Sequence, residues 1–162
     1  MEQDKLDYIE ESALLFEQLG MTRMVGRVFG YLVVSDEDAV SFDQIREALQ
    51  ASKGSISATT RQLMQIGFIE AVSKPGDRKT YFRISGIEIT DFLRARMQMF
   101  DLFSEKMNKG RNLKNREDDV SQWLLEASAF YSWVGSELEG IINTWKNEKE
   151  QIIRDYEKNN KT

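Results

Sequence analysis

Apolar side chains recur at helical spacing at the beginning of the chain and throughout its second half. Within residues 4–19 they lie three or four positions apart, with acidic residues between them: Leu6, Ile9, Ala13, Phe16 and Leu19. This spacing places them on one face of a helix. Gly20 follows directly, and a glycine in that place favours the end of the helix.

Two longer stripes occupy the C-terminal half. Residues 87–108 carry one that consists of Ile89, Leu93, Met97, Phe100, Phe103 and Met107. Residues 117–157 carry another that consists of Val120, Leu124, Ala127, Tyr131, Val134, Leu138, Ile141, Trp145, Ile152 and Tyr156. Each stripe predicts one long amphipathic helix. The segment between them, residues 108–119, is polar and is expected to be a loop.

Shorter elements are predicted in between. Residues 22–35 predict an apolar helix, in which Gly26 and Gly30 lie one turn apart and allow close packing of another helix. Residues 39–42 are expected to form a very short strand, and residues 43–51 a helix. The inward side chains of that helix are expected to be Ile45, Ala48 and Leu49.

The helix predicted after Ser52 has two unlike sides. Its first half, SKGSISATTR at residues 52–61, is small, rich in hydroxyls and basic, and Ile56 is nearly its only residue to bury. Ser52 is a favourable helix-capping residue. The residues expected to face the core are spaced four, three and four apart: Ile56, Thr60, Leu63 and Gly67.

Two runs typical of β-strands follow, FIEAVSK and TYFRIS, on either side of PGDRK. A Pro-Gly-Asp turn between such runs predicts a β-hairpin. Its apolar contributors are expected to be Phe68, Val72, Tyr81 and Ile84. The chain is therefore predicted to be mainly α-helical, with one small β-hairpin.

Charge is distributed unevenly along the chain. The net charge of the 162 residues is −5, yet residues 41–85 hold seven cations against four acids. A local basic patch matters more than the total charge for binding a polyanion. The zone that contains SKGSISATTR and the hairpin is therefore the expected contact for a nucleic acid.

Composition narrows the remaining choices. Cysteine and histidine are both absent, which removes thiol chemistry, zinc-finger ligands and the commonest general base. An enzyme, a metal site or a cofactor is therefore not expected. No apolar run reaches transmembrane length, and the acidic N-terminus MEQDKLDYIEE is unlike a signal peptide. The protein is expected in the cytoplasm, without membrane contact.

The order helix, helix, turn, helix and hairpin over residues 22–86 is typical of a winged helix–turn–helix domain. In such domains one helix enters the major groove of DNA, which is about 12 Å wide. The small, polar front of the helix after Ser52 suits that groove. Arg78 and Lys79, beside the tight turn, suit the minor groove or flanking phosphates. Taken singly, these features also fit helix caps, a neutral helix surface and an ordinary solvated turn.

Four stretches, in this order, resemble the MarR superfamily of winged helix–turn–helix transcriptional regulators, and especially its GbsR-like branch: VSFDQIREAL, ASKGSIS, RQLMQIGFIE and KPGDRKTYFRI. The resemblance extends over nearly the whole chain. It implies a homodimeric repressor or activator that binds double-stranded DNA. It assigns the recognition-helix role to Lys53, Gly54, Ser55, Ser57, Ala58, Thr59, Arg61 and Gln62, and the wing role to Lys74, Arg78 and Lys79.

The wing departs from the pattern of the family in one respect. Many members carry Asp-x-Arg at the wing tip, whereas here Asp77 is followed by Arg78 and then Lys79. This leaves open which cation enters the minor groove, and Arg78 is the first candidate.

The flanking regions, residues 1–21 and 87–162, are expected to mediate dimerisation. Their apolar stripes are longer than a small helical head can cover, and exposed stripes of this size mark interfaces. The candidate interface residues are Leu6, Ile9, Phe16, Trp145, Ile152 and Tyr156. The alternative is that the two C-terminal helices pack only on each other within one chain.

Two further alternatives stay open. Some GbsR-like regulators respond to quaternary-ammonium compounds, and aromatic side chains bind such cations. The last helix is rich in aromatic residues, although their helical spacing is more typical of a core or an interface, so the existence of a small-molecule effector is undecided. The winged helix could also bind another protein instead of DNA, a role that would not need the SKGSIS front or the cationic wing tip.

Overall fold

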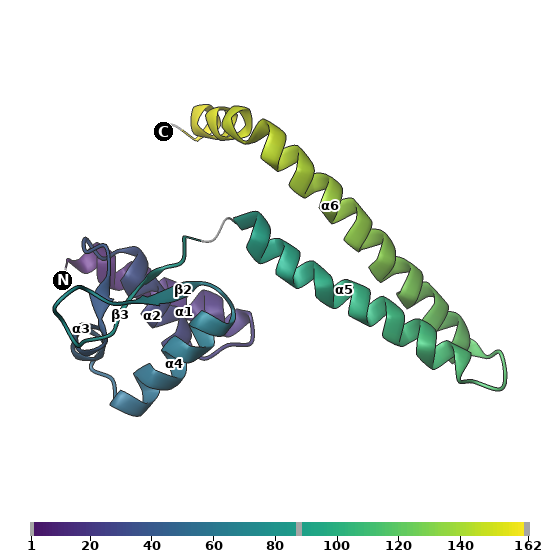
Figure 1. Cartoon of the computed structure of the whole chain (residues 1–162), viewed down its shortest axis with the longest axis horizontal. Helices are drawn as coiled ribbons and strands as arrows, with labels where there is room; N and C mark the ends of the chain where they lie inside the picture. The colour runs from purple at the N-terminus through teal and green to yellow at the C-terminus, as the bar shows by residue number, and fades with distance from the viewer. Residues whose placement is uncertain (1, 87–88, 161–162) are drawn as a thin grey trace. The chain divides into compact units, whose positions relative to one another are not determined.

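The computed structural model describes residues 2–86 and 89–160, whose helices and strands are drawn in Figure 1. The chain forms two compact units, residues 1–87 and residues 88–162. The first unit combines helices with a small sheet, and the described part of the second consists of two long helices.

The first unit has the element order of a winged helix. Its elements are α1 (Gln3–Gln18), α2 (Arg23–Val33), β1 (Val40–Ser41), α3 (Phe42–Ala48), α4 (Lys53–Gln65), β2 (Ile69–Val72) and β3 (Tyr81–Ile84). The strands form an antiparallel sheet in the order β1-β3-β2. β2 and β3 are the arms of the predicted hairpin, and the short β1 pairs Val40 with Phe82. The predicted fold class is therefore confirmed.

One hydrophobic core joins α2, α3 and α4 to the sheet. Its fully buried side chains include Val25, Val28, Ile45, Ile56 and Leu63. Burying a side chain of this size stabilises the fold by about 1.5–3 kcal/mol relative to leaving it exposed. In the hairpin, the deeply buried residues are Ile69, Tyr81 and Phe82, whereas Ile84, which was expected inside, is 38% exposed.

Gly26 and Gly30 allow α1 to lie directly against α2. A Cβ atom on Gly26 would be 2.3 Å from the carbonyl oxygen of Ser12, and one on Gly30 would be 2.9 Å from Ser12 Oγ. Real Cβ atoms do not approach that closely, so only glycine fits both positions without a shift of α1. The predicted close packing is confirmed, and its partner is α1.

α1 buries fewer residues than its stripe predicts, and it buries them within its own unit. Ile9 and Phe16 are 1% and 3% exposed, whereas Leu6 and Leu19 are 38% and 62% exposed. The ring of Phe16 packs against those of Phe29 and Phe68. The prediction that Ile9 and Phe16 contact a second copy is therefore corrected, because their side chains are already covered by their own chain.

The second unit is a hairpin of α5 (Ile89–Asn112) and α6 (Asp119–Asn159), which lie side by side in Figure 1. Ser104 and Ser128 form hydrogen bonds between the two helices. Each hydroxyl donates to the other residue's backbone carbonyl oxygen, at 2.9 and 3.0 Å. The loop predicted from residue 108 begins later, because polar residues do not interrupt a helix. Lys109 and Arg111 lie in the last turn of α5, where cations are favourable for the helix dipole.

The stripe predicted along α6 drifts away from the buried side. Ile142 is 1% exposed, whereas Ile141, Val120 and Tyr156 are 59%, 54% and 69% exposed. A real helix has 3.6 residues per turn, so the chosen steps of three and four leave the inner face over such a length. Residues 146–160 at the end of α6 are exposed throughout.

Asp118 caps the beginning of α6 and accepts hydrogen bonds from two cationic side chains. One carboxylate oxygen accepts a hydrogen bond from the backbone N–H of Ser121 at 2.9 Å, and the other from Lys114 Nζ at 2.9 Å and Arg116 Nε at 3.1 Å. The hydrogen bond from Lys114, followed by those from Ser121, lowers the pKa of Asp118 to about 2. The ionised form is therefore the one that the folded hairpin favours.

Replacing Gly26 with alanine is expected to destabilise the first unit by about 1–3 kcal/mol, because the added methyl group meets the backbone of α1. The Gly54→Ala variant is the matched control, since Gly54 lies on an exposed part of α4 with free space around it. Denaturant unfolding checks both. Equal stability of Gly26→Ala and the wild type would contradict the packing described for α1.

Asp118→Asn is expected to lower the melting temperature at neutral pH, since it keeps a capping side chain but removes the charge. Because the pKa of Asp118 is about 2 when folded and about 3.9 when unfolded, its contribution is complete above the unfolded value and is lost as the pH falls through the folded one. The difference between wild type and variant should therefore shrink between about pH 4 and pH 2. Thermal melts followed by circular dichroism test this, with the exposed Glu148→Gln as control. A difference that does not depend on pH would contradict it.

Candidate nucleic-acid interface

α4 is attached to the core along one side. Ile56 and Leu63 are 0% exposed, and Thr60 is 3% exposed. The hydroxyl of Thr60 donates a hydrogen bond to the carbonyl oxygen of Ile56 at 2.9 Å, which satisfies that buried polar group. At the start of the helix the hydroxyl of Ser52 accepts from the N–H of Ser55 at 3.2 Å, so the predicted cap is confirmed. These contacts set the rotation of α4 and therefore the face that it turns outward.

Most of the residues predicted to face outward do so. Lys53, Gly54, Ala58 and Arg61 are exposed, and Ser55, Ser57 and Gln62 are half-buried. Thr59 corrects the prediction, since it is only 5% exposed. It lies three residues after Ile56 and four before Leu63, so it shares their inner face. Gly67, which was expected on that face, lies beyond the end of the helix with φ +81°.

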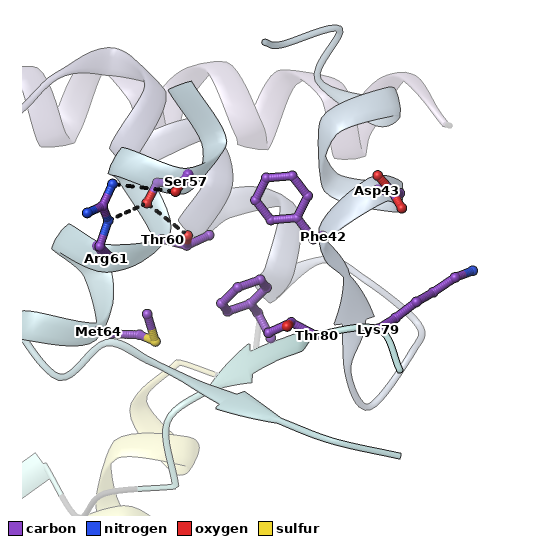
Figure 2. Close-up of a pocket in the computed structure, with 9 residues that line it drawn as sticks. Phe42, Asp43, Ser57, Thr60, Arg61, Met64, Lys79 and Thr80 are labelled. Atoms are coloured by element: carbon purple, nitrogen blue, oxygen red, sulfur yellow. Dashed lines mark hydrogen bonds between the residues drawn. The ribbon is translucent and has the colours of Figure 1, made fainter. Parts of the chain in front are cut away.

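Arg61 lies along the outer face of α4 toward the beginning of the helix (Figure 2). Its Nε donates to the carbonyl oxygen of Ser57 at 3.3 Å, and its Nη2 is 3.5 Å from Ser57 Oγ. Both contacts are long for hydrogen bonds and therefore weak. In the part of the chain that the structure describes, no carboxylate forms an ion pair with Lys53 or Arg61. Their charges are available to an external anion.

A cleft of about 280 Å³ separates α4 from the beginning of β3 (Figure 2). Its lining residues are Phe42, Asp43, Ser57, Thr60, Arg61, Met64, Lys79, Thr80 and Phe82. Figure 2 shows Arg61 on one side of this cleft and Lys79 on the other. The cleft therefore has a cation from the helix and a cation from the hairpin at its two edges.

The wing, defined as residues 73–80 between β2 and β3, is exposed throughout. The N–H of Asp77 donates to the carbonyl oxygen of Lys74 at 3.1 Å, and Gly76 has φ +80°. Pro75 precedes it. A proline at the second position and a glycine with positive φ at the third are typical of a type II turn. The turn predicted from Pro-Gly-Asp is therefore present.

Tyr81 contacts the wing on both sides of this turn. Its hydroxyl donates to Asp77 Oδ2 at 2.7 Å, while Asp77 Oδ1 accepts from the N–H of Lys79 at 2.9 Å. Lys74 Nζ lies 4.1 Å from the centroid of the Tyr81 ring, a cation–π contact. From the sequence Tyr81 was expected only as an apolar residue, since its place under the turn depends on strand pairing and has no local signal.

The three wing cations differ in the contacts that their side chains make. Lys74 is held over the Tyr81 ring. Neither Arg78 nor Lys79 forms an ion pair with a carboxylate among residues 2–86 and 89–160. Arg78 and Lys79 are therefore available to an external anion. The expectation that Lys74, Arg78 and Lys79 all bind DNA stays a prediction.

The described residues contain neither a membrane-spanning helix nor a metal site. No helix there is apolar over a length sufficient to cross a membrane. No group of three or more metal-ligating side chains occurs among the described residues. What α4 and the wing present together is hydrogen-bond donors and positive charge.

Known proteins are similar to this chain in sequence and in fold. Residues 27–85 match a family model described as a winged helix DNA-binding domain. The chain is 42% identical over 83 residues to the HTH-type transcriptional regulator MmpR5 of Mycobacterium tuberculosis, covering 51% of this chain and 50% of that protein. It is 34% identical over 77 residues to the HTH-type transcriptional repressor GbsR of Bacillus subtilis, covering 48% of this chain and 40% of that protein. The matches thus span half or less of these curated relatives.

A crystal structure of a transcriptional regulator is also similar, with a TM-score of 0.79 and 29% sequence identity, covering 89% of this chain and 99% of that chain. The resemblance to winged helix transcriptional regulators, and to GbsR among them, is confirmed by these matches. Residues 27–85 of this chain therefore have a winged helix fold and are similar to the DNA-binding domains of HTH-type transcriptional regulators.

Proposed function

We propose that this protein is a transcriptional regulator that binds specific sequences of double-stranded DNA as a homodimer. In this proposal α4 enters the major groove, and the wing contacts the minor groove or the flanking phosphates. The observation that carries it is the orientation of α4, whose apolar side is buried while its small, polar side faces solvent, with Lys53 and Arg61 in no ion pair among the described residues. The names of the relatives MmpR5 and GbsR support the same function.

The outer side of α4 has the shape and the chemistry that a groove requires. Gly54 and Ala58 are small and exposed, so the helix backbone can approach the bases closely. Ser57 and Arg61 lie one turn apart on that side and offer hydrogen-bond donors to base edges. The free N–H groups at the start of the helix favour a nearby phosphate.

The wing adds a second contact to the same duplex. Arg78 and Lys79 are exposed beside the type II turn, and Lys79 lies on the side of the cleft opposite to Arg61, with its side chain directed away from Arg61 (Figure 2). A DNA duplex in contact with both α4 and the wing would meet a cation from each. Such contacts supply affinity without reading sequence.

Exposed apolar residues support the homodimer. Leu6, Ile152 and Tyr156 are 38%, 36% and 69% exposed, and Trp145 is half-buried. They remain the candidate interface residues after Ile9 and Phe16 are removed from the set. Exposed apolar surface of this kind marks protein interfaces. Two copies would present two recognition helices to half-sites about 34 Å apart along the duplex.

Selection of genomic DNA fragments by the purified protein, followed by sequencing, tests the proposed function. A recurrent motif with two related half-sites is the expected result. The rival function is a winged helix that binds another protein, and it predicts neither a motif nor salt-sensitive binding to duplex DNA. Absence of both would overturn the proposal in favour of that rival.

Arg61→Ala is expected to weaken binding to the selected duplex by about 1–3 kcal/mol and to relax the preference at one base position. The melting temperature should change little, because the side-chain hydrogen bonds found for Arg61 among the described residues are long ones to Ser57 on its own helix. Arg23→Ala, which removes an arginine that is paired with Glu17, is the control. Equal losses on selected and random duplexes would show that Arg61 binds phosphate and does not read a base.

Arg78→Ala should weaken binding to many sequences alike, since a cation at the wing tip acts mainly on phosphates or groove potential. Loss of one phosphate contact should reduce the salt slope of the binding constant by about 0.9 per protomer. Titrations at several salt concentrations measure it, with the exposed Lys106→Ala on α5 as a charge-matched control. A slope identical to that of the wild type would show that Arg78 does not contact DNA.

Light scattering at micromolar concentration should give twice the chain mass of 18.8 kDa. The reason is that the exposed apolar residues of α1 and α6 are expected to be covered by a second copy. Tyr156→Lys is expected to shift the protein toward the monomer, whereas Asn143→Lys, a change at another exposed position of α6, should not. A wild-type protein that is monomeric would remove the homodimer from the proposed function.

A further inference from the structure

The exposed wing is tied to the sheet by one buried side chain, Tyr81. Tyr81 is the first residue of β3, the central strand, and pairs with Ser41 on β1 and with Val72 on β2. It is 8% exposed. Tyr81 is therefore fixed by the sheet, and whatever it holds in the wing is fixed with it.

Tyr81 holds the wing at two points. Lys74, before the turn, lies over its ring at 4.1 Å from the centroid. Asp77, after the turn, accepts a hydrogen bond from its hydroxyl at 2.7 Å. The other oxygen of Asp77 accepts from the N–H of Lys79 at 2.9 Å, so the same carboxylate also fixes the backbone on the far side of Arg78.

The protonation states suit this arrangement. The hydrogen bond from Tyr81 is the first cause that lowers the pKa of Asp77, with the N–H of Lys79 next, so the carboxylate stays charged. The same hydrogen bond is the first cause that raises the pKa of Tyr81, so its hydroxyl keeps the proton that it donates. Hydrogen bonds to an ionised acceptor are short and strong.

We propose that Tyr81 is a positioning residue for DNA binding: its hydroxyl holds Asp77, Asp77 holds the wing backbone, and Arg78 is thereby presented to the duplex. This inference rests on the proposed function, in which the wing contacts DNA. A wing without this support has to be ordered when DNA binds, and that loss of conformational freedom lowers affinity. Tyr81 itself does not touch the nucleic acid.

Tyr81→Phe tests the inference because it removes the hydroxyl and keeps the ring under Lys74. The probe is a fluorescein-labelled duplex of mixed sequence, titrated with the full chain at several salt concentrations. Binding at low salt is expected to weaken about tenfold. The salt slope should fall toward that of Arg78→Ala, although no charge has been removed. Tyr8→Phe makes the same chemical change at an exposed position of α1 and should behave as the wild type does.

A double-mutant cycle separates positioning from a general effect on the fold. In an Arg78→Ala background, Tyr81→Phe should cause little further loss, because the cation that it positions is gone. A Tyr81→Phe variant with wild-type affinity and slope overturns the inference. A general effect on the fold would also overturn the inference. Its signs are that Tyr81→Phe weakens DNA binding by the same factor with and without Arg78, lowers the melting temperature and leaves the salt slope unchanged.

Asp77→Ala gives a second test through the sign of its effect. Removing a negative charge from the wing should strengthen binding to a polyanion if Asp77 acts only through its charge. The proposed support predicts weaker binding instead, and stronger binding would overturn it. A wild-type chain that shows no salt-dependent binding to the duplex would remove the proposed function itself, whereas wild-type binding that is unaffected by both the Tyr81 and Asp77 changes removes the positioning role alone.

Discussion

Ile56 and Leu63 are fully buried in the core of the first unit, and their burial sets the rotation of α4. Rotating the helix would expose two large aliphatic side chains, each worth about 1.5–3 kcal/mol when buried. Thr59 and Thr60 broaden this inner face with residues that are 5% and 3% exposed. Everything that α4 offers to a partner follows from this one constraint, since the residues that remain outside are mainly small, polar or basic.

The wing depends on a second, weaker set of contacts. Its residues are exposed, so burial does not hold them. A type II turn and the hydrogen bonds around Asp77 define its path instead. α4 and the wing are therefore stabilised differently, α4 by apolar packing and the wing by polar contacts to Tyr81. Changes in the core should affect both stability and binding, whereas changes under the wing should affect mainly binding.

Much of this arrangement could be predicted from the sequence, where local spacing carried the information. The inward positions of Ile56, Thr60 and Leu63, the cap at Ser52 and the turn at Gly76 all follow from patterns within a few residues. Thr59 was misplaced because the buried face of α4 is wider than a single stripe. Ile141 was misplaced because small errors in helical phase accumulate along α6.

Other features depend on contacts between distant parts of the chain. An apolar stripe predicts that Ile9 and Phe16 are buried, but it does not show against which surface. In the structure they are buried against α2 and the core of the first unit. Likewise, the contacts of Tyr81 with Lys74 and Asp77 follow from the pairing of β3 with β1 and β2, which places Tyr81 next to the wing. Neither the burial of Ile9 and Phe16 against α2 nor the contacts of Tyr81 in the wing can be predicted from the neighbouring residues in the sequence.

If α4 binds in the major groove, its position on DNA can be mapped directly. The chain has no cysteine, so Gln65→Cys gives a single attachment point for an iron-chelate cleavage reagent at the exposed end of α4, outside the residues proposed to contact the duplex. Strand cleavage confined to a few base pairs within each half-site of the selected duplex is expected. The same reagent on Asn143→Cys, an exposed position of α6, should give a different pattern or none. Uniform cleavage along the duplex from Gln65→Cys, or a pattern identical to that from Asn143→Cys, would contradict binding of α4 in the major groove.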